Sequence, residues 1–330
     1  MASTFNVGAI VAQHFLLSPQ AKTLSIARVA RMSDGEARAT FQAIRWAATD
    51  GEPVCPRCDC AACYSYKTRP IFKCKACGHQ FSATSGTIFA DRKLPVRDYL
   101  LAIALFVNGA KGVSALQLSR EMGVSYRAAF VLAHRLREAM AQDQDTGETL
   151  SGEVEVDGAY FGGHIVPANY KANRVDRRLA RYQTGKRGVV VVMRERWGRT
   201  LPFVTHSEAQ GVGTVMDRVE PSATVYADEA PHWDALHARF LTRRINHQQA
   251  YSHDGASTNH AESLFSRLRR AEIGTHHHIS GRYLGAYASE MAWREDRRRI
   301  SNGDQFLAAV SAALAAPPSD RWRGYWRRSK

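Results

Sequence analysis

Residues 153–161 read Glu-Val-Glu-Val-Asp-Gly-Ala-Tyr-Phe, a Val-rich stretch that predicts a buried β-strand with an acid, Asp157, inside it. Four later segments with Val-rich or alternating patterns also predict strands, and three segments among them predict helices. The strands are expected at residues 188–194, 200–206, 223–228 and 242–246, and the helices at 211–219, 231–240 and 259–270. This order indicates an α/β fold with a mixed sheet and helices packed on it.

Three acidic side chains lie on the predicted strands and on the last predicted helix. Asp157 lies inside the first strand, and Asp228 ends the fourth, just before a helix that starts at Pro231. Asn259 and Glu262 lie three residues apart on the last helix and therefore share one face. If the sheet forms as predicted, Asp157, Asp228 and Glu262 can meet, and their oxygens suit Mg²⁺ or Mn²⁺. Two such ions could act on a phosphodiester, although each acid taken singly fits a helix cap or a surface charge.

The six cysteines fall together between positions 55 and 77, which is typical of a metal site and not of the disulfides of a secreted chain. Four thiolate ligands leave no open coordination position, so a zinc ion held by them would be structural. Cys60 and Cys63 form a further pair whose role stays open. The zinc-ribbon spacing, two Cys-x-x-Cys pairs with fifteen residues between them, is met by Cys55/Cys58 and Cys74/Cys77.

Residues 114–137 predict two helices joined by a tight turn. Ser114 and Gln117 form a capping box, Gly123 permits the turn, and Ser125 can cap the second helix. A short helix, a glycine turn and a basic second helix predict a helix-turn-helix that could lie in a major groove of DNA. Two packed helices with basic solvent faces are the alternative. The residues expected to point outward or towards the helix end are Tyr126, Arg127, His134, Arg135 and Arg137.

Further basic residues flank the predicted acids. Cations in this position fit a phosphate backbone that runs across the site. They lie in an insertion after the first strand and on the last helix beyond Glu262. They are Lys171, Arg174, Arg177, Arg178, Arg181, Lys186 and Arg187 in the insertion and Arg267, Arg269 and Arg270 on the helix.

Composition narrows the class of protein. The chain has 330 residues and 36.7 kDa, with 45 Lys and Arg against 31 Asp and Glu, a net charge of +14 and a pI near 9.8. Such a charge favours a polyanionic partner, namely DNA. No apolar stretch reaches the length of a membrane span, and no basic residue precedes Lys22, so neither membrane insertion nor a signal peptide is predicted. We expect a protein of the reducing cytoplasm.

Changes in residue composition and hydrophobic pattern along the chain predict its domains. A polar stretch at residues 142–147 marks the main boundary, and we find no internal repeat. The expected parts are a helical segment (1–50), a zinc ribbon (51–90), a helix-turn-helix region (91–142), the α/β domain (148–300), and a C-terminal helix with a basic tail (301–330), the tail being peripheral.

In their order along the chain, several stretches resemble bacterial insertion-sequence transposases of the zinc-ribbon, ISXO2-like branch, which is related to the Merlin elements. The resemblance spans about residues 40–300. It implies an RNase H-like catalytic domain of the DDE type, Mg²⁺-dependent DNA cleavage, and joining of transposon ends to target DNA. It also implies a nucleoid-associated protein that forms at least a homodimer. The likeness is carried by residues 45–51, Cys55-Pro56-Arg57-Cys58, residues 74–82, 85–89, 111–118, 134–137 and 156–163, and Asn259-His260-Ala261-Glu262-Ser263.

The resemblance also assigns roles to the acids. The first two catalytic positions match Asp157 and Asp228, while the third is Asn259 or Glu262; chemistry favours Glu262, because an anionic oxygen binds a metal better than an amide. Asp228 lacks the preceding Thr of the relatives, and His232 is the candidate for the His expected soon after it. A DNA-binding regulator or inactive remnant, and a nuclease without strand transfer, are the alternative functions.

Overall fold

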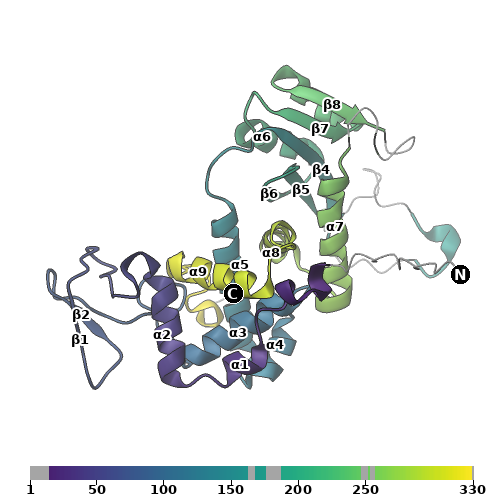
Figure 1. Ribbon diagram of the computed structural model, residues 1–330. Helices are drawn as coiled ribbons and strands as arrows, with labels where there is room; N and C mark the ends of the chain where they lie inside the picture. The colour runs from purple at the N-terminus through teal and green to yellow at the C-terminus, as the bar shows by residue number, and fades with distance from the viewer. Residues whose placement is uncertain (1–14, 163–167, 176–186, 247–251, 253–256, 329–330) are drawn as a thin grey trace, which may run out of the picture.

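The computed structural model describes residues 15–162, 168–175, 187–246, 252 and 257–328. Within them lie a small antiparallel sheet, a group of helices, and a five-stranded sheet with its own helices (Figure 1). The small sheet consists of β1 (Cys63–Ser65), β2 (Phe72–Cys74) and β3 (Gln80–Phe81). The helical group consists of α1 (Ile26–Ala30), α2 (Asp34–Arg45), α3 (Val96–Asn108), α4 (Ala115–Met122), α5 (Tyr126–Gln144) and α9 (Asn302–Ala315).

The large sheet has the strand order β6-β5-β4-β7-β8. Strands β4, β5 and β6 pair antiparallel, whereas β7 and β8 run parallel to β4. The α/β, RNase H-like arrangement expected from the sequence is confirmed, and its strand and helix bounds agree with the prediction to within three residues. The elements are β4 (Glu153–Phe161), β5 (Gly188–Glu195), β6 (Thr200–Thr205), α6 (Glu208–Arg218), β7 (Thr224–Asp228), a 3₁₀ helix (Pro231–Ala238), β8 (Leu241–Ile245), α7 (Asn259–Ala271) and α8 (Leu284–Asp296).

The two faces of this sheet are covered by different helices. Val154 and Val156 belong to the core that includes Val215 of α6. Ala159 and Phe161, on the opposite face of β4, pack with residues of α7 and α8. Burial on both faces explains why the central strands are continuous apolar runs and not simple alternations. The position of a residue along β4 therefore decides which helix it meets.

The helical group has its own core, built from α2, α3, α5 and α9 and joined by residues of the small sheet. The two helices and the turn between them form as predicted: Ser114 and Ser125 cap the helices, and Gly123 ends α4 at φ +63°, a left-handed conformation that glycine adopts without strain. The capping box expected at Ser114 is only half formed, because the Gln117 side chain donates to Glu121 at 2.8 Å. No helix in these described parts of the chain combines the length and apolar character needed to cross a membrane.

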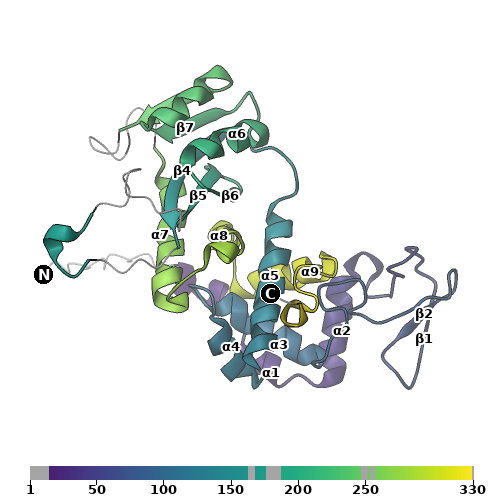
Figure 2. The same ribbon diagram turned by 180° about the vertical axis from the view of Figure 1, so that it is seen from behind.

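Helix α8 lies between the large sheet and the helical group, in contact with both β6 and α5 (Figure 1 and Figure 2). A buried ion-pair cluster fixes this junction. Glu290 of α8 accepts from Arg137 Nε of α5 at 2.6 Å and from Arg294 Nε at 2.9 Å. Arg294 also donates to the carbonyls of Phe106 and Val107 at the end of α3, at 2.6 and 3.0 Å. The cluster thus links α3, α5 and α8 through buried side chains.

Two expectations about the helical group are wrong. His134 and Arg137 do not face outward; they are buried, because α8 and the C-terminal segment cover that side of α5. The segment after α9 is not wholly peripheral, since Trp322 is buried and stacks on His134 with ring centroids 4.4 Å apart. Both errors have one cause. Local periodicity predicts that this face of α5 is exposed, but segments distant in the sequence cover it.

Candidate active site

Asp157 and Asp228 lie on two adjacent parallel strands. Val156 pairs with Ala227 in the register of β4 and β7, so the two acids stand beside each other one step further along. Because Val156 and Ala227 face α6, Asp157 and Asp228 point to the opposite face, on the side of α7. The Gly158 N–H donates to Asp157 Oδ1 at 2.7 Å, and the Ala230 N–H donates to Asp228 Oδ1 at 3.1 Å. The fold brings these two predicted residues together.

Glu262 approaches from α7, which begins at Asn259 and packs against β4. Glu262 is half-buried in the first turn of the helix, and its negative charge is one of those that raise the pKa of Asp157. The two carboxylates are therefore within electrostatic reach of each other. Asn259, on the same turn, is exposed.

A fourth carboxylate, Glu208, escapes the sequence analysis. It is the first residue of α6, and its side chain lies directly over Gly158: a Cβ built on Gly158 would come within 2.4 Å of Glu208 Cγ. Its Oε2 is 3.4 Å from Nε2 of His232, in the 3₁₀ helix that follows Asp228. Glycine next to Asp157 was the available signal, since a glycine inside a strand often marks a close approach by another group.

The neighbouring acids affect the protonation of Asp157 and Glu208. Burial, followed by the charges of Asp228, Glu262 and Glu208, raises the pKa of Asp157 well above its usual range, against the opposing Gly158 hydrogen bond. Burial and the charge of Asp228 raise the pKa of Glu208, while burial lowers that of His232. Gathered carboxylates repel one another, and a divalent cation relieves this repulsion. Carboxylate oxygens are also the donors that Mg²⁺ and Mn²⁺ prefer, so the chemistry of these residues suits such an ion. Their oxygens are not drawn together as closely as the cysteine sulfurs, which form the group of ligand atoms found within 4.8 Å of one another among the described residues.

The predicted cysteine ligands also converge. The Sγ atoms of Cys55, Cys58, Cys74 and Cys77 all lie within 4.8 Å of one another, with Cys55–Cys77 at 3.7 Å and Cys58–Cys74 at 3.6 Å. A zinc tetrahedron with Zn–S bonds of ~2.3 Å has edges of roughly 3.8 Å, which matches these distances. The Cys77 N–H, which donates to the Cys74 sulfur, lowers the pKa of Cys74 to about 6. Cys60 and Cys63 lie outside this group and approach backbone carbonyls instead.

The arginines predicted to contact DNA divide into two sets. Arg137 is buried against Glu290, so its assignment to the DNA-facing surface is wrong. Arg135 is half-buried and donates to the Ile88 carbonyl at 2.9 Å, and Arg267 binds Glu295 at 2.6 Å. Lys186 lies outside the described residues. The predicted arginines that are exposed are Arg127, Arg187, Arg269 and Arg270.

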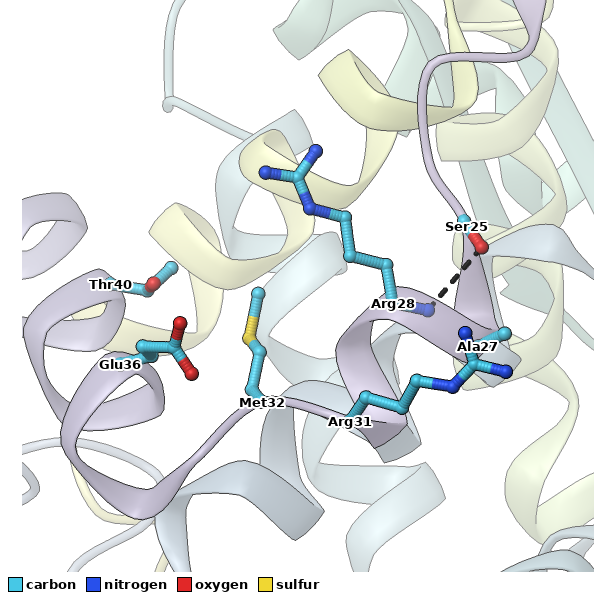
Figure 3. A pocket seen from close by; sticks show the side chains of 7 residues that line it. All are labelled: Ser25, Ala27, Arg28, Arg31, Met32, Glu36 and Thr40. Carbon is cyan, nitrogen blue, oxygen red and sulfur yellow. Dashed lines mark hydrogen bonds between the residues drawn. The ribbon is translucent and has the colours of Figure 1, made fainter.

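A separate surface pocket of about 460 Å³ lies between α1 and α2 (Figure 3). Arg28 and Arg31 contribute from the α1 side, and Glu36 and Thr40 from α2. Glu36 is already engaged in a capping box with Ser33, whose N–H and hydroxyl lower the pKa of the Glu36 carboxyl. None of the four acids lines this pocket, so it is not part of the candidate active site.

Two family models match this chain, one over the α/β domain and one over the segment that contains the cysteines. Residues 149–296 match the ISXO2-like transposase domain, and residues 32–80 match the transposase zinc-ribbon domain. The chain is 25% identical over 301 residues to an uncharacterized protein in transposable element ISH50 of Halobacterium salinarum, covering 86% of this chain and 98% of that protein.

Two solved structures of the Mos1 transposase are also similar: the strand transfer complex and a pre-cleavage transpososome. Both are 12% identical and cover 65% of this chain and 78% of theirs, with TM-scores of 0.24 and 0.23, values too low to contribute to the assignment. The two family matches lie in the order expected from the sequence. The chain therefore carries an ISXO2-like transposase domain preceded by a transposase zinc-ribbon domain.

Proposed function

We propose that this protein is an active DNA transposase that cleaves phosphodiesters at transposon ends and joins the freed 3′-hydroxyl to target DNA. The observation that carries the proposal is the adjacency of Asp157 and Asp228 on parallel strands, with Glu262 in electrostatic reach. A regulator without catalysis would gain nothing from gathering acids at a half-buried place, because their mutual repulsion disfavours the ionised forms.

In this proposal Asp157, Asp228 and Glu262 hold two Mg²⁺ or Mn²⁺ ions. Divalent ions bound there supply the charge that stabilises the attacking and leaving oxygens of the phosphodiester. Asp157 would be one ligand, with Asp228 beside it on the neighbouring strand and Glu262 approaching from α7. The Gly158 N–H orients one of its oxygens, so the strand itself sets the direction of the carboxylate.

The third ligand is Glu262 in preference to Asn259, and a plasmid assay tests this. With Mg²⁺ and a supercoiled plasmid that carries the inverted repeats flanking its own reading frame, the wild type should nick the repeats and join their ends. Glu262→Gln should lower the cleavage rate at least ~100-fold, because an amide replaces an anionic ligand. Asn259→Ala should lower it less than ~10-fold.

Glu272→Gln, which removes a carboxylate just beyond the end of α7, is the matched control and should cleave as the wild type does. A larger loss in Asn259→Ala than in Glu262→Gln would assign the third ligand to the amide. Cleavage without joining of pre-cleaved ends would identify a nuclease, and DNA binding without cleavage would identify a regulator.

The cysteine group holds, in the same proposal, one structural Zn²⁺ that fixes the ribbon. Four thiolates complete the tetrahedron, so this ion takes no part in cleavage. The ribbon and the α4–α5 unit would bind the terminal repeats, with Arg127 exposed at the start of α5. Arg187, Arg269 and Arg270 would face the DNA near the acids. Two transposon ends must be cut together, so we propose at least a dimer during the reaction.

Zinc content separates the ligand cysteines from the remaining pair. Cys58→Ser should lower bound zinc from about one ion per chain to nearly none and unfold the ribbon, since binding and folding of such a site are coupled. Cys63→Ser, which leaves the four-sulfur group intact, is the control and should retain its zinc. Atomic absorption measures both. Equal loss of zinc in the two variants would contradict the proposed ligand set.

A further inference from the structure

Glu155 is a buried carboxylate that the proposed chemistry does not use. It lies on β4 two residues before Asp157, so both side chains point to the α7 face of the sheet. The side chain of Glu155 is 0% exposed. Burying a carboxylate is unfavourable unless hydrogen bonds and a cation compensate it, and the partners of Glu155 therefore show what it does.

One oxygen of Glu155 binds the start of α7. Glu155 Oε2 accepts from the backbone N–H groups of His260 at 2.8 Å and Ala261 at 3.2 Å. These N–H groups lie in the first turn, where a helix has no internal acceptors and carries partial positive charge. The N-cap residue, Thr258, makes no side-chain cap hydrogen bond. A carboxylate from β4 thus replaces the usual cap.

The other oxygen of Glu155 has three neighbours. Oε1 accepts from Arg196 Nε at 3.1 Å and from the Ser257 hydroxyl at 3.3 Å, and His260 Nδ1 lies 3.2 Å from it. The Arg196 guanidinium also stacks over the ring of Tyr226 on β7, 3.8 Å from its centroid. The buried charge is therefore compensated, and its rotamer is fixed by groups from the β5–β6 hairpin, from β7 and from the segment before α7.

We propose that Glu155 is a positioning residue: by capping α7 from the strand that carries Asp157, it sets where Glu262 stands relative to Asp157. This inference rests on the proposed function, since it matters for catalysis only if Glu262 and Asp157 share metal ions. In this inference Glu155 acts through α7 and is not itself a metal ligand. Glu155 and Asp157 are two residues apart on one strand. This fixed spacing thereby sets the separation between Asp157 and Glu262, which are 105 positions apart in the chain.

The test compares Glu155→Gln and Glu155→Asp with the full-length wild type. Gln keeps an acceptor but loses the charge that the helix terminus and Arg196 favour, whereas Asp keeps the charge but is one methylene too short. Both should raise the dissociation constant for Mn²⁺, measured by calorimetry, about tenfold, as loss of an outer partner does at metal sites. Both should also raise the Mg²⁺ concentration for half-maximal cleavage, with a smaller change in the rate at saturating Mg²⁺.

Glu153→Gln is the control, because Glu153 lies on the same strand and contacts Arg196 and Tyr226 without touching α7. Its Mn²⁺ affinity should equal that of the wild type. Lower melting temperatures with unchanged Mn²⁺ affinity in both Glu155 variants would show a merely structural role and overturn the inference. A wild type that binds no Mn²⁺ and cleaves no DNA would overturn the proposed function itself.

Discussion

The Asp157→Asn variant is expected to fold and bind DNA but to lose at least about a thousandfold in Mg²⁺-dependent cleavage. The amide keeps the shape of the side chain and removes the anionic oxygens that Asp228 and Glu262 would share ions with. Rates from plasmid nicking measure the effect. Asp217→Asn, an exposed position on α6, is the control and should cleave at the wild-type rate. Cleavage by Asp157→Asn at that rate would place the metal site elsewhere.

The same variant should be more stable than the wild type at neutral pH in the absence of metal. Burial and the neighbouring carboxylates raise the folded-state pKa of Asp157 above that of the unfolded chain, so the native state prefers the neutral acid. Stability of the wild type is therefore lost as the pH rises from about 4 through the raised pKa. Asp157→Asn removes this loss. Its melting temperature in EDTA should exceed that of the wild type at pH 7, and the difference should vanish near pH 4.

The largest effect on stability is expected from Glu290→Gln. Glu290 is fully buried between Arg137 and Arg294, which hold the pKa of its carboxyl below the usual range despite burial. Removal of this charge leaves two buried guanidinium groups without a counter-ion, which should lower the free energy of unfolding by about 3–5 kcal/mol. Urea denaturation followed by tryptophan fluorescence measures it.

The comparison for this prediction is Glu148→Gln, which removes an acid 79% exposed that pairs with Arg199 at 3.8 Å. An exposed pair of this kind contributes less than about 1 kcal/mol. If both variants unfold at the same urea concentration, the buried cluster does not fix the junction between α5 and α8.

The sequence predicts the sheet and the two strand-borne acids because their signals are local. A run of four valines, Val189 to Val192, strongly favours a buried strand. Asp228 ends a second apolar stretch, and Pro231, which follows shortly after it, marks the end of that strand. The cysteine spacing is equally local, since each Cys-x-x-Cys pair forms its own turn. Glu262 follows from helical periodicity once α7 is recognised.

What the sequence does not predict depends on pairs that are distant along the chain. The place of Glu208 follows from where α6 begins relative to Gly158, a register that no periodicity encodes. Arg137 lies at a helical spacing that predicts exposure to DNA. It is instead buried, because it donates to Glu290, which lies 153 positions later in the chain. The cap on α7 escapes for the same reason, because Glu155 alone in a Val-rich strand resembles a second catalytic acid.

Helix α9 has a consequence for how the protein is made. It is the last α-helix among the described residues, yet Phe306 and Val310 fill the core shared by α2, α3 and α5. Until α9 has been synthesised, the apolar faces of α2, α3 and α5 therefore lack part of their cover. A chain truncated before α9 would expose that surface and become a substrate for proteases.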